Sequence, residues 1–221
     1  MRKTLRYLFS VSAILLLILP CRAQEERVHG PRIGYDASGL TLLYFQPERR
    51  IHTLSLDYEI KREIYPVLEL GWQNVKIEKD QYHYHSDGKF ARVGLDINLI
   101  RDENPVNYDM GFAGFRYGFS YMNQSASHII IEETYWGDLT GSEIVENQLM
   151  VHWISVGGGL RAEVFPNFFM GWSLFANLKL ARTGDANMDP YNIPGFGSGS
   201  RRLALTINYS LYYRIPLFHY R

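Results

Sequence analysis

Cysteine is almost absent from this 221-residue chain, because Cys21 is the single one and it lies close to the N-terminus. If residues 1–23 are removed on export, disulfides cannot contribute to the stability of the rest. No segment contains 18 consecutive apolar residues, which excludes a membrane-spanning helix. A basic stripe of the kind that binds nucleic acid is also missing, since 23 Lys and Arg stand against 23 Asp and Glu.

The first 23 residues have the features of an export signal. Three basic residues open the segment, and Leu8–Leu19 is an apolar run too short to cross a bilayer. Cys21 and Ala23 then occupy the small-residue positions of a cut before Gln24. A lipoprotein signal is the alternative, although Pro20 fits poorly before its cysteine. We expect a cleaved signal peptide over 1–23 and one domain over 24–221, whose 19 basic and 23 acidic residues give a formal charge of −4.

The remaining chain alternates between apolar and polar residues, which is typical of half-buried β-strands. In Phe90–Leu99 one face is uncharged and consists of Ala91, Val93, Leu95, Ile97 and Leu99. The pattern predicts eight strands, over residues 32–37, 51–61, 65–77, 90–99, 109–121, 149–164, 168–180 and 203–213. In the third strand the apolar parity shifts to Val75 and Ile77, which predicts a β-bulge.

The expected connections alternate in length. Short ones lie at 62–64, 101–105 and 165–167, and long ones at 78–89, 123–148 and 181–202. Bacterial barrels with both termini in the periplasm have short periplasmic turns and long external loops. We therefore predict an all-β fold, an eight-stranded antiparallel up-and-down transmembrane β-barrel, in the outer membrane of a Gram-negative bacterium.

Alternation alone does not say which face is outside, since a soluble lipocalin-like barrel has its apolar face inside. Here the polar face is rich in Gly, Ser and Asn, which suits a narrow lumen, and aromatic residues lie at strand ends, as in membrane girdles. We therefore predict that these residues face lipid: Leu95, Ile97, Phe115, Tyr117, Trp172, Leu174, Leu178, Leu205 and Ile207.

The opposite face collects charged residues of both signs. The predicted polar network of the lumen comprises Asp57, Glu59, Glu69, Arg92, Asp96, Arg116, Arg161, Glu163, Lys179 and Arg214. Because eight strands enclose a lumen that side chains fill, we interpret this network as structural. A gated path for protons or ions is the alternative.

No motif predicts catalytic, cofactor-binding or metal-binding residues. His152 and Ser155 have opposite parity, so they should lie on opposite faces, and no G-x-S-x-G turn occurs. His83 and His85 provide only two ligands of a metal site. Residues 185–189 begin like a calcium loop but lack its turn glycine and closing glutamate.

The expected loop 123–148 carries acids without any Lys or Arg: Glu132, Glu133, Asp138, Glu143 and Glu146. It also contains Ile129–Ile131, which indicates that strand pairing extends beyond the membrane. The acids could bind a cationic partner or divalent ions, or they could simply keep the loop soluble.

The segments GFRYGFS (114–120), GLDINLI (94–100) and YYRIPL (212–217) resemble a family of uncharacterised small bacterial outer-membrane barrels, known only as a domain of unknown function. The resemblance implies an architecture similar to OmpA/OmpX-type barrels and no functional residue. The chain departs from it by ending in Phe218–Arg221 rather than in an aromatic residue. The signal read by the barrel-assembly machinery would then fall on Tyr209, Leu211 and Tyr213.

Three functions remain open from the sequence. The leading one is a structural or surface-interaction role through extracellular loops, with outer-membrane lipid as the surrounding partner. The second is an outer-leaflet lipid-modifying enzyme, either a deacylase or an acyltransferase. The third is a soluble lipocalin-like ligand-binding barrel.

Overall fold

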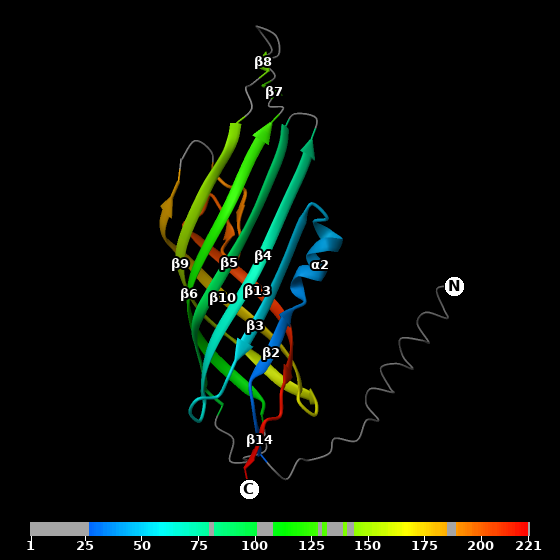
Figure 1. Ribbon diagram of the computed structural model, residues 1–221, viewed down its shortest axis with the longest axis vertical. Coiled ribbons are helices and arrows are strands. Elements are labelled where there is room, and N and C mark those ends of the chain that lie inside the picture. Colours follow the sequence, from blue (N-terminus) through cyan, green and yellow to red (C-terminus); the bar gives the residue numbers. More distant parts are fainter. Residues whose placement is uncertain are drawn as a thin grey trace, which may run out of the picture.

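Eight strands form one closed barrel in the computed structural model, which describes residues 27–79, 82–100, 108–127, 130–131, 139–140, 144–184 and 189–220. The barrel strands are β2 (Arg32–Asp36), β3 (Arg49–Asp57), β4 (Ile64–Lys79), β5 (Tyr82–Asn98), β6 (Met110–Ser127), β9 (Ile144–Phe165), β10 (Phe168–Thr183) and β13 (Leu203–Arg214). Each pairs antiparallel with its neighbours in chain order, and β13 closes the barrel on β2. The predicted eight-stranded antiparallel barrel is confirmed (Figure 1).

Shorter elements mark the two ends of the barrel. At one end, called here the lower rim, β1 (Arg27–His29) pairs with β14 (Phe218–Tyr220). At the other, the upper rim, β7 (Ile130–Ile131) pairs with β8 (Leu139–Thr140), so strand pairing extends beyond the barrel as expected (Figure 1). The last barrel strand is β13, which ends at Arg214, and β14 lies outside the barrel sheet.

The barrel wall is much taller on one side than on the other. β4, β5, β6 and β9 have 16, 17, 18 and 22 residues, whereas β2 has five and β3 has nine. The expected long loop over 78–89 is wrong, because β4 and β5 stay paired as far as Lys79 and Tyr82. Above the apolar part, the outer residues of these strands become polar, so the expected alternation no longer marks them as strands.

The β-bulge predicted at Val75 and Ile77 is also wrong. β4 keeps an unbroken register with both β3 and β5 through this region. Val75 is fully buried inside the barrel and packs with Tyr84 and Ala126. The parity of the strand is therefore unchanged, and it is the polarity of its two faces that reverses above Trp72.

The second predicted strand was extended too far. β3 ends at Asp57, and the chain then turns through Glu63, whose φ of 71° lies in the left-handed region. Glu59 belongs to this turn, where one of its oxygens accepts the backbone N–H of Glu63 at 3.3 Å. Glu59 also lies 3.4 Å from the imidazole of His29, so it stands at the lower rim rather than among the lumen charges.

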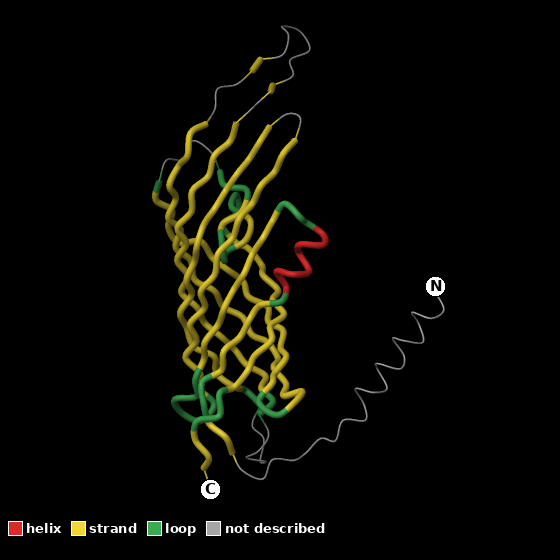
Figure 2. Tube along the Cα trace, turned by 45° about the vertical axis from the view of Figure 1, so that its right-hand side comes forward, coloured by secondary structure: helices red, strands yellow, loops and turns green. Residues whose placement is uncertain are grey.

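Part of the expected external loop 181–202 folds into the upper lumen instead. It contains the short strands β11 (Asn192–Ile193) and β12 (Gly197–Ser198), and the coil drawn in green within the upper half of the barrel in Figure 2. Ile193 and Phe196 are fully buried there against Phe90 and Trp153 of the barrel wall. We call residues 189–202 the plug.

A helix that the sequence did not predict, α2 (Ser38–Phe45), connects β2 to β3. Figures 1 and 2 show it on the outer side of the wall, beside β3. Its side chains are mainly apolar, and Tyr44 and Phe45 are among the most exposed large hydrophobic residues of the described part of the chain. No helix in the described ranges is both long and apolar enough to cross a membrane.

Candidate functional site

The outer surface of the barrel carries a continuous apolar zone. It runs over residues 91–99, which comprise the end of β5 and the residue after it, and it ends below Lys89. On β4 it ends at Trp72. A strand of about 9–11 residues is what a tilted β-strand needs to cross the hydrocarbon core of a bilayer. Eight of the nine predicted lipid-facing residues are at least 40% exposed on this surface: Leu95, Ile97, Phe115, Tyr117, Trp172, Leu174, Leu205 and Ile207. The ninth, Leu178, is half-buried.

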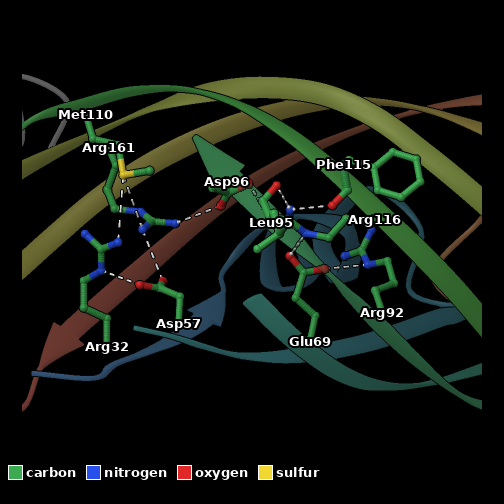
Figure 3. Close-up of polar contacts among 10 residues, drawn as sticks. All are labelled: Arg32, Asp57, Glu69, Arg92, Leu95, Asp96, Met110, Phe115, Arg116 and Arg161. Carbon is green, nitrogen blue, oxygen red and sulfur yellow. Dashed lines mark hydrogen bonds and ion pairs between the residues drawn. The ribbon is translucent and has the colours of Figure 1, made fainter. Parts of the chain in front are cut away.

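The lower half of the lumen holds a row of alternating charges. It runs from β2 to β5 through six different strands, and Figure 3 shows its members pointing toward one another. In order along the row these are Arg32, Asp57, Arg161, Asp96, Arg116, Glu69 and Arg92. We call these seven residues the charge row.

The contacts within the charge row range from 2.6 to 4.0 Å, and the longest joins Arg161 to Asp96. Asp57 lies 2.6 Å from Arg32 and 3.2 Å from Arg161, which in turn is 4.0 Å from Asp96. Asp96 lies 2.7 Å from Arg116. Glu69 completes the row, with 3.5 Å to Arg116 and 2.6 Å to Arg92. Every carboxylate therefore lies between two guanidinium groups.

Burial makes these pairings structurally important. Asp57 and Asp96 have fully buried carboxylates, and the arginine side chains of the row are at most 6% exposed. Buried charges are tolerated mainly when they are paired and hydrogen-bonded. The row has four arginines for three carboxylates, so it keeps one formal positive charge.

Aromatic rings and one sulfur atom enclose the arginines. Arg161 lies over the ring of Tyr212 at 4.0 Å, and Arg32 lies over Tyr65 at 4.5 Å. The sulfur of Met110 is 3.8 Å from nitrogens of both Arg32 and Arg161 (Figure 3). Cation–π contacts of this kind stabilise guanidinium groups that have lost water.

Four of the predicted network residues lie outside the charge row, and one of them, Glu59, stands at the lower rim beside His29. Arg214 lies 3.2 Å from Glu163 and 3.0 Å from the side-chain oxygen of Asn167, which forms a second cluster at the lower rim. The ammonium group of Lys179 donates to the carbonyl oxygen of Gly199 and so holds the plug rather than a carboxylate. The sequence predicted these residues as polar and inward-facing, but it did not predict which of them meet.

Two tyrosine–histidine pairs lie on the outer surface near the upper limit of the apolar zone. The hydroxyl of Tyr117 is 2.7 Å from Nδ1 of His152, and that of Tyr35 is 2.8 Å from Nδ1 of His52. No sequence pattern indicated these pairs, because their members come from different strands. Ser155 is buried in the lumen, so His152 lies on the opposite face, as its parity predicts.

The remaining sequence candidates do not assemble into a site. His83 and His85 lie on β5 rather than in a loop, and the described residues contain no group of three metal-ligating side chains. Asp189 pairs with Arg182, while residues 185–188 lie outside the described residues. Of the acidic loop, Glu132, Glu133, Asp138 and Glu143 also lie outside them.

A family model, described as a domain of unknown function, matches residues 4–220, which is nearly the whole chain. The chain belongs to the DUF6048 family. No curated protein matches it in sequence. The charge row and the plug are thus features of a DUF6048 barrel.

Solved structures give a weaker likeness to this DUF6048 chain. CarO2 of Acinetobacter baumannii has 10% sequence identity and a TM-score of 0.42, covering 87% of this chain and 100% of CarO2. A major outer membrane protein from Thermus thermophilus has 8% identity and a TM-score of 0.46, covering 85% and 100%. CarO of A. baumannii has 10% identity and a TM-score of 0.37, covering 86% and 98%.

Proposed function

We propose that this protein is an outer-membrane β-barrel with a sealed lumen that acts at the cell surface rather than as a channel. The observation that carries the proposal is the arrangement of polarity across the wall. Leu95 and its outward neighbours are exposed, while Asp96, the next residue on the same strand, is fully buried among arginines. A lipocalin-like soluble barrel has the opposite arrangement.

Two layers of side chains support a closed lumen. The charge row crosses the lower half, and the plug packs into the upper half, where Trp153 and Phe196 have no exposed surface. A conducting pore needs a continuous aqueous path, and eight strands leave little room for one. This favours the structural interpretation of the charges over a gated path for ions.

The tall wall supports a role at the surface. β4, β5, β6 and β9 rise beyond the apolar zone, and above it their outer residues are polar, among them Lys76, Asp87 and Asn123. In the proposed orientation this four-stranded wall stands outside the cell, with the lower rim in the periplasm. It offers a broad polar sheet to partners in the environment.

The test is the behaviour of the full chain in a Gram-negative host. We expect residues 24–221 in the outer-membrane fraction, resistance to carbonate extraction, and a gel mobility that changes on heating. We expect no steady conductance in planar bilayers. Recovery as a soluble periplasmic protein, or a steady conductance of the unmodified barrel, contradicts the proposal.

A further inference from the structure

The hydrogen-bonded wall of the barrel is incomplete between β3 and β13. β2 separates these strands but is short: β13 pairs with it over Ser210–Arg214, and β3 pairs with it over Leu54–Asp57. Within the described ranges, no strand pairs on this side with residues 203–208 of β13 or residues 49–53 of β3. A gap therefore opens in the wall above the end of β2.

The backbone of β13 directs polar groups into this gap. The carbonyl of Tyr209 points toward β2, where it accepts the N–H of Ala37 at 2.8 Å. Because backbone directions alternate along a strand, Leu205 and Ile207 point their N–H and C=O groups the same way. Their side chains are 68% and 73% exposed in the apolar zone. Backbone groups without partners are unfavourable in hydrocarbon, so another group must cover them.

Helix α2 stands beside the gap, and a pocket lies behind it. The helix packs closely on β3, since a Cβ atom on Gly39 would lie 2.2 Å from the carbonyl oxygen of Ile51. Between α2, the plug and the two strands lies a pocket of about 340 Å³. Binding sites for small molecules are typically about 300–1,000 Å³, so this space is large enough for part of a ligand.

The pocket is apolar at the wall and polar inside. Leu42, Leu205 and Ile207 line it on the side of the apolar zone, whereas Thr206 and Asn208 line it from the inward face of β13. The side facing the bilayer therefore suits a hydrocarbon chain, and the inner side suits a polar group.

The inner side carries positive charge that the protein does not fully pair. Nε of Arg49 is buried and has no hydrogen-bond partner in the described part of the chain. Arg49 stands above the upper end of the apolar zone on β4, and burial lowers its pKa from the ordinary value. Arg92, the last member of the charge row, also lines the pocket and is paired with Glu69. Asp36, the acid in the lining, already accepts the N–H and the hydroxyl of Ser38.

We infer that this pocket binds an acyl chain with an anionic oxygen headgroup, which enters sideways from the membrane. The headgroup accepts hydrogen bonds from Arg49, and the chain passes between α2 and β13, where it covers the backbone of Leu205 and Ile207. This inference rests on the proposed membrane location, because only then does the gap open to lipid.

The experiment uses the full barrel in liposomes and three photoreactive probes of equal chain length, each with a diazirine on the chain. One is a free fatty acid, one is a phosphatidylglycerol that stays in the bilayer, and one is an alkyl trimethylammonium with a cationic headgroup. Cross-linked peptides are mapped by mass spectrometry. We expect an anionic probe to label Leu205–Asn208 far more than the outward residues of β5, and the cationic probe to show no such preference.

Two variants test the pocket itself. Arg49→Gln should lower the labelling of this segment by the anionic probe about tenfold, because a charged hydrogen-bond donor is lost. Thr206→Trp fills the space and should abolish the preference. The matched controls are Arg50→Gln, which changes the exposed neighbour of Arg49, and Leu203→Trp, which adds the same ring to the outer face of β13. Neither control should change the labelling.

The outcomes distinguish a bilayer lipid from a free amphiphile as the ligand, and failure of the pocket from failure of the proposed function. Preferential labelling by the phosphatidylglycerol probe identifies the ligand source as a bilayer lipid, and labelling by the fatty acid alone identifies a free amphiphile. Equal labelling around the barrel that neither Arg49→Gln nor Thr206→Trp alters overturns the pocket. The same liposomes are tested for resistance of the barrel to carbonate extraction. If the barrel resists it, the loss of the pocket leaves the proposed function intact.

Discussion

Trp153 on the barrel wall packs edge-to-face against Phe196 of the plug, with ring centroids 5.9 Å apart and an interplanar angle of 71°. Both side chains are fully buried. This contact joins a strand to a segment more than forty residues away in sequence, and it closes the upper lumen. The plug is therefore part of the hydrophobic core of the barrel.

Phe196→Ala should lower the free energy of unfolding by about 3–5 kcal/mol, because it removes a buried ring and leaves a cavity. Phe45→Ala is the control, since Phe45 is 77% exposed on α2. Urea titration in detergent micelles, followed by heat-modifiable gel mobility, measures both. Equal stability of the two variants would show that the plug does not contribute to the core.

Gly195→Ala should loosen the plug specifically. Gly195 has a φ of 73°, and a Cβ atom there would lie 2.5 Å from the ring of Phe90. The left-handed conformation alone costs a non-glycine residue about 1–2 kcal/mol. Hydrogen exchange over residues 189–200 should become faster, whereas Ser200→Ala at the exposed end of the plug should leave it unchanged. Unchanged exchange in both would contradict the tight fit of Gly195.

Asp96→Asn should destabilise the barrel by about 3–5 kcal/mol, since it leaves Arg116 and Arg161 buried without the carboxylate between them. Asp87→Asn, on the exposed face of the same strand, should have little effect. In the double variant Asp96→Asn/Arg116→Met, part of the lost stability should return, because one uncompensated charge is removed. Folding titrations in lipid vesicles give all three values, and additive losses in the double variant would argue against coupling within the charge row.

Leu95→Arg should cost about 2–4 kcal/mol when the barrel is folded into vesicles, because Leu95 lies in the middle of the apolar zone. His85→Arg places the same side chain on the same face of β5 but above the zone, and we expect it to be neutral. Similar effects at the two positions would mean that the apolar zone does not contact lipid.

The sequence predicts best where the two faces of a strand differ most in polarity. On β5, exposed apolar residues such as Leu95 alternate with buried charged residues such as Asp96, and strands with this pattern were located correctly. The prediction fails at Val75, because there the inner face becomes apolar and the outer face polar, which imitates a bulge. It also fails at the β4–β5 hairpin, where the inner face is again apolar and the outer face polar, although the strands stay paired up to Lys79 and Tyr82.

The plug and the side pocket could not be predicted from local patterns. Residues around Gly195 read as a turn, and only the surrounding wall shows that Phe196 is buried. Six of the seven residues of the charge row belong to the predicted polar network, but the order of the row depends on how six strands meet in the lumen. Glu59 was misplaced because the alternating pattern continues for four residues past Asp57, the last residue of β3.

The most direct test of the account is site-specific labelling of the barrel folded into liposomes from residues 24–221, which contain no native cysteine. Cysteine is introduced at Leu174, on the outer face of β10, or at its inward neighbour Ser173. A lipid-soluble maleimide should react with the first and not with the second. Reaction at Ser173 from the bilayer, with Leu174 protected, would contradict the central claim that the apolar face of each strand contacts lipid.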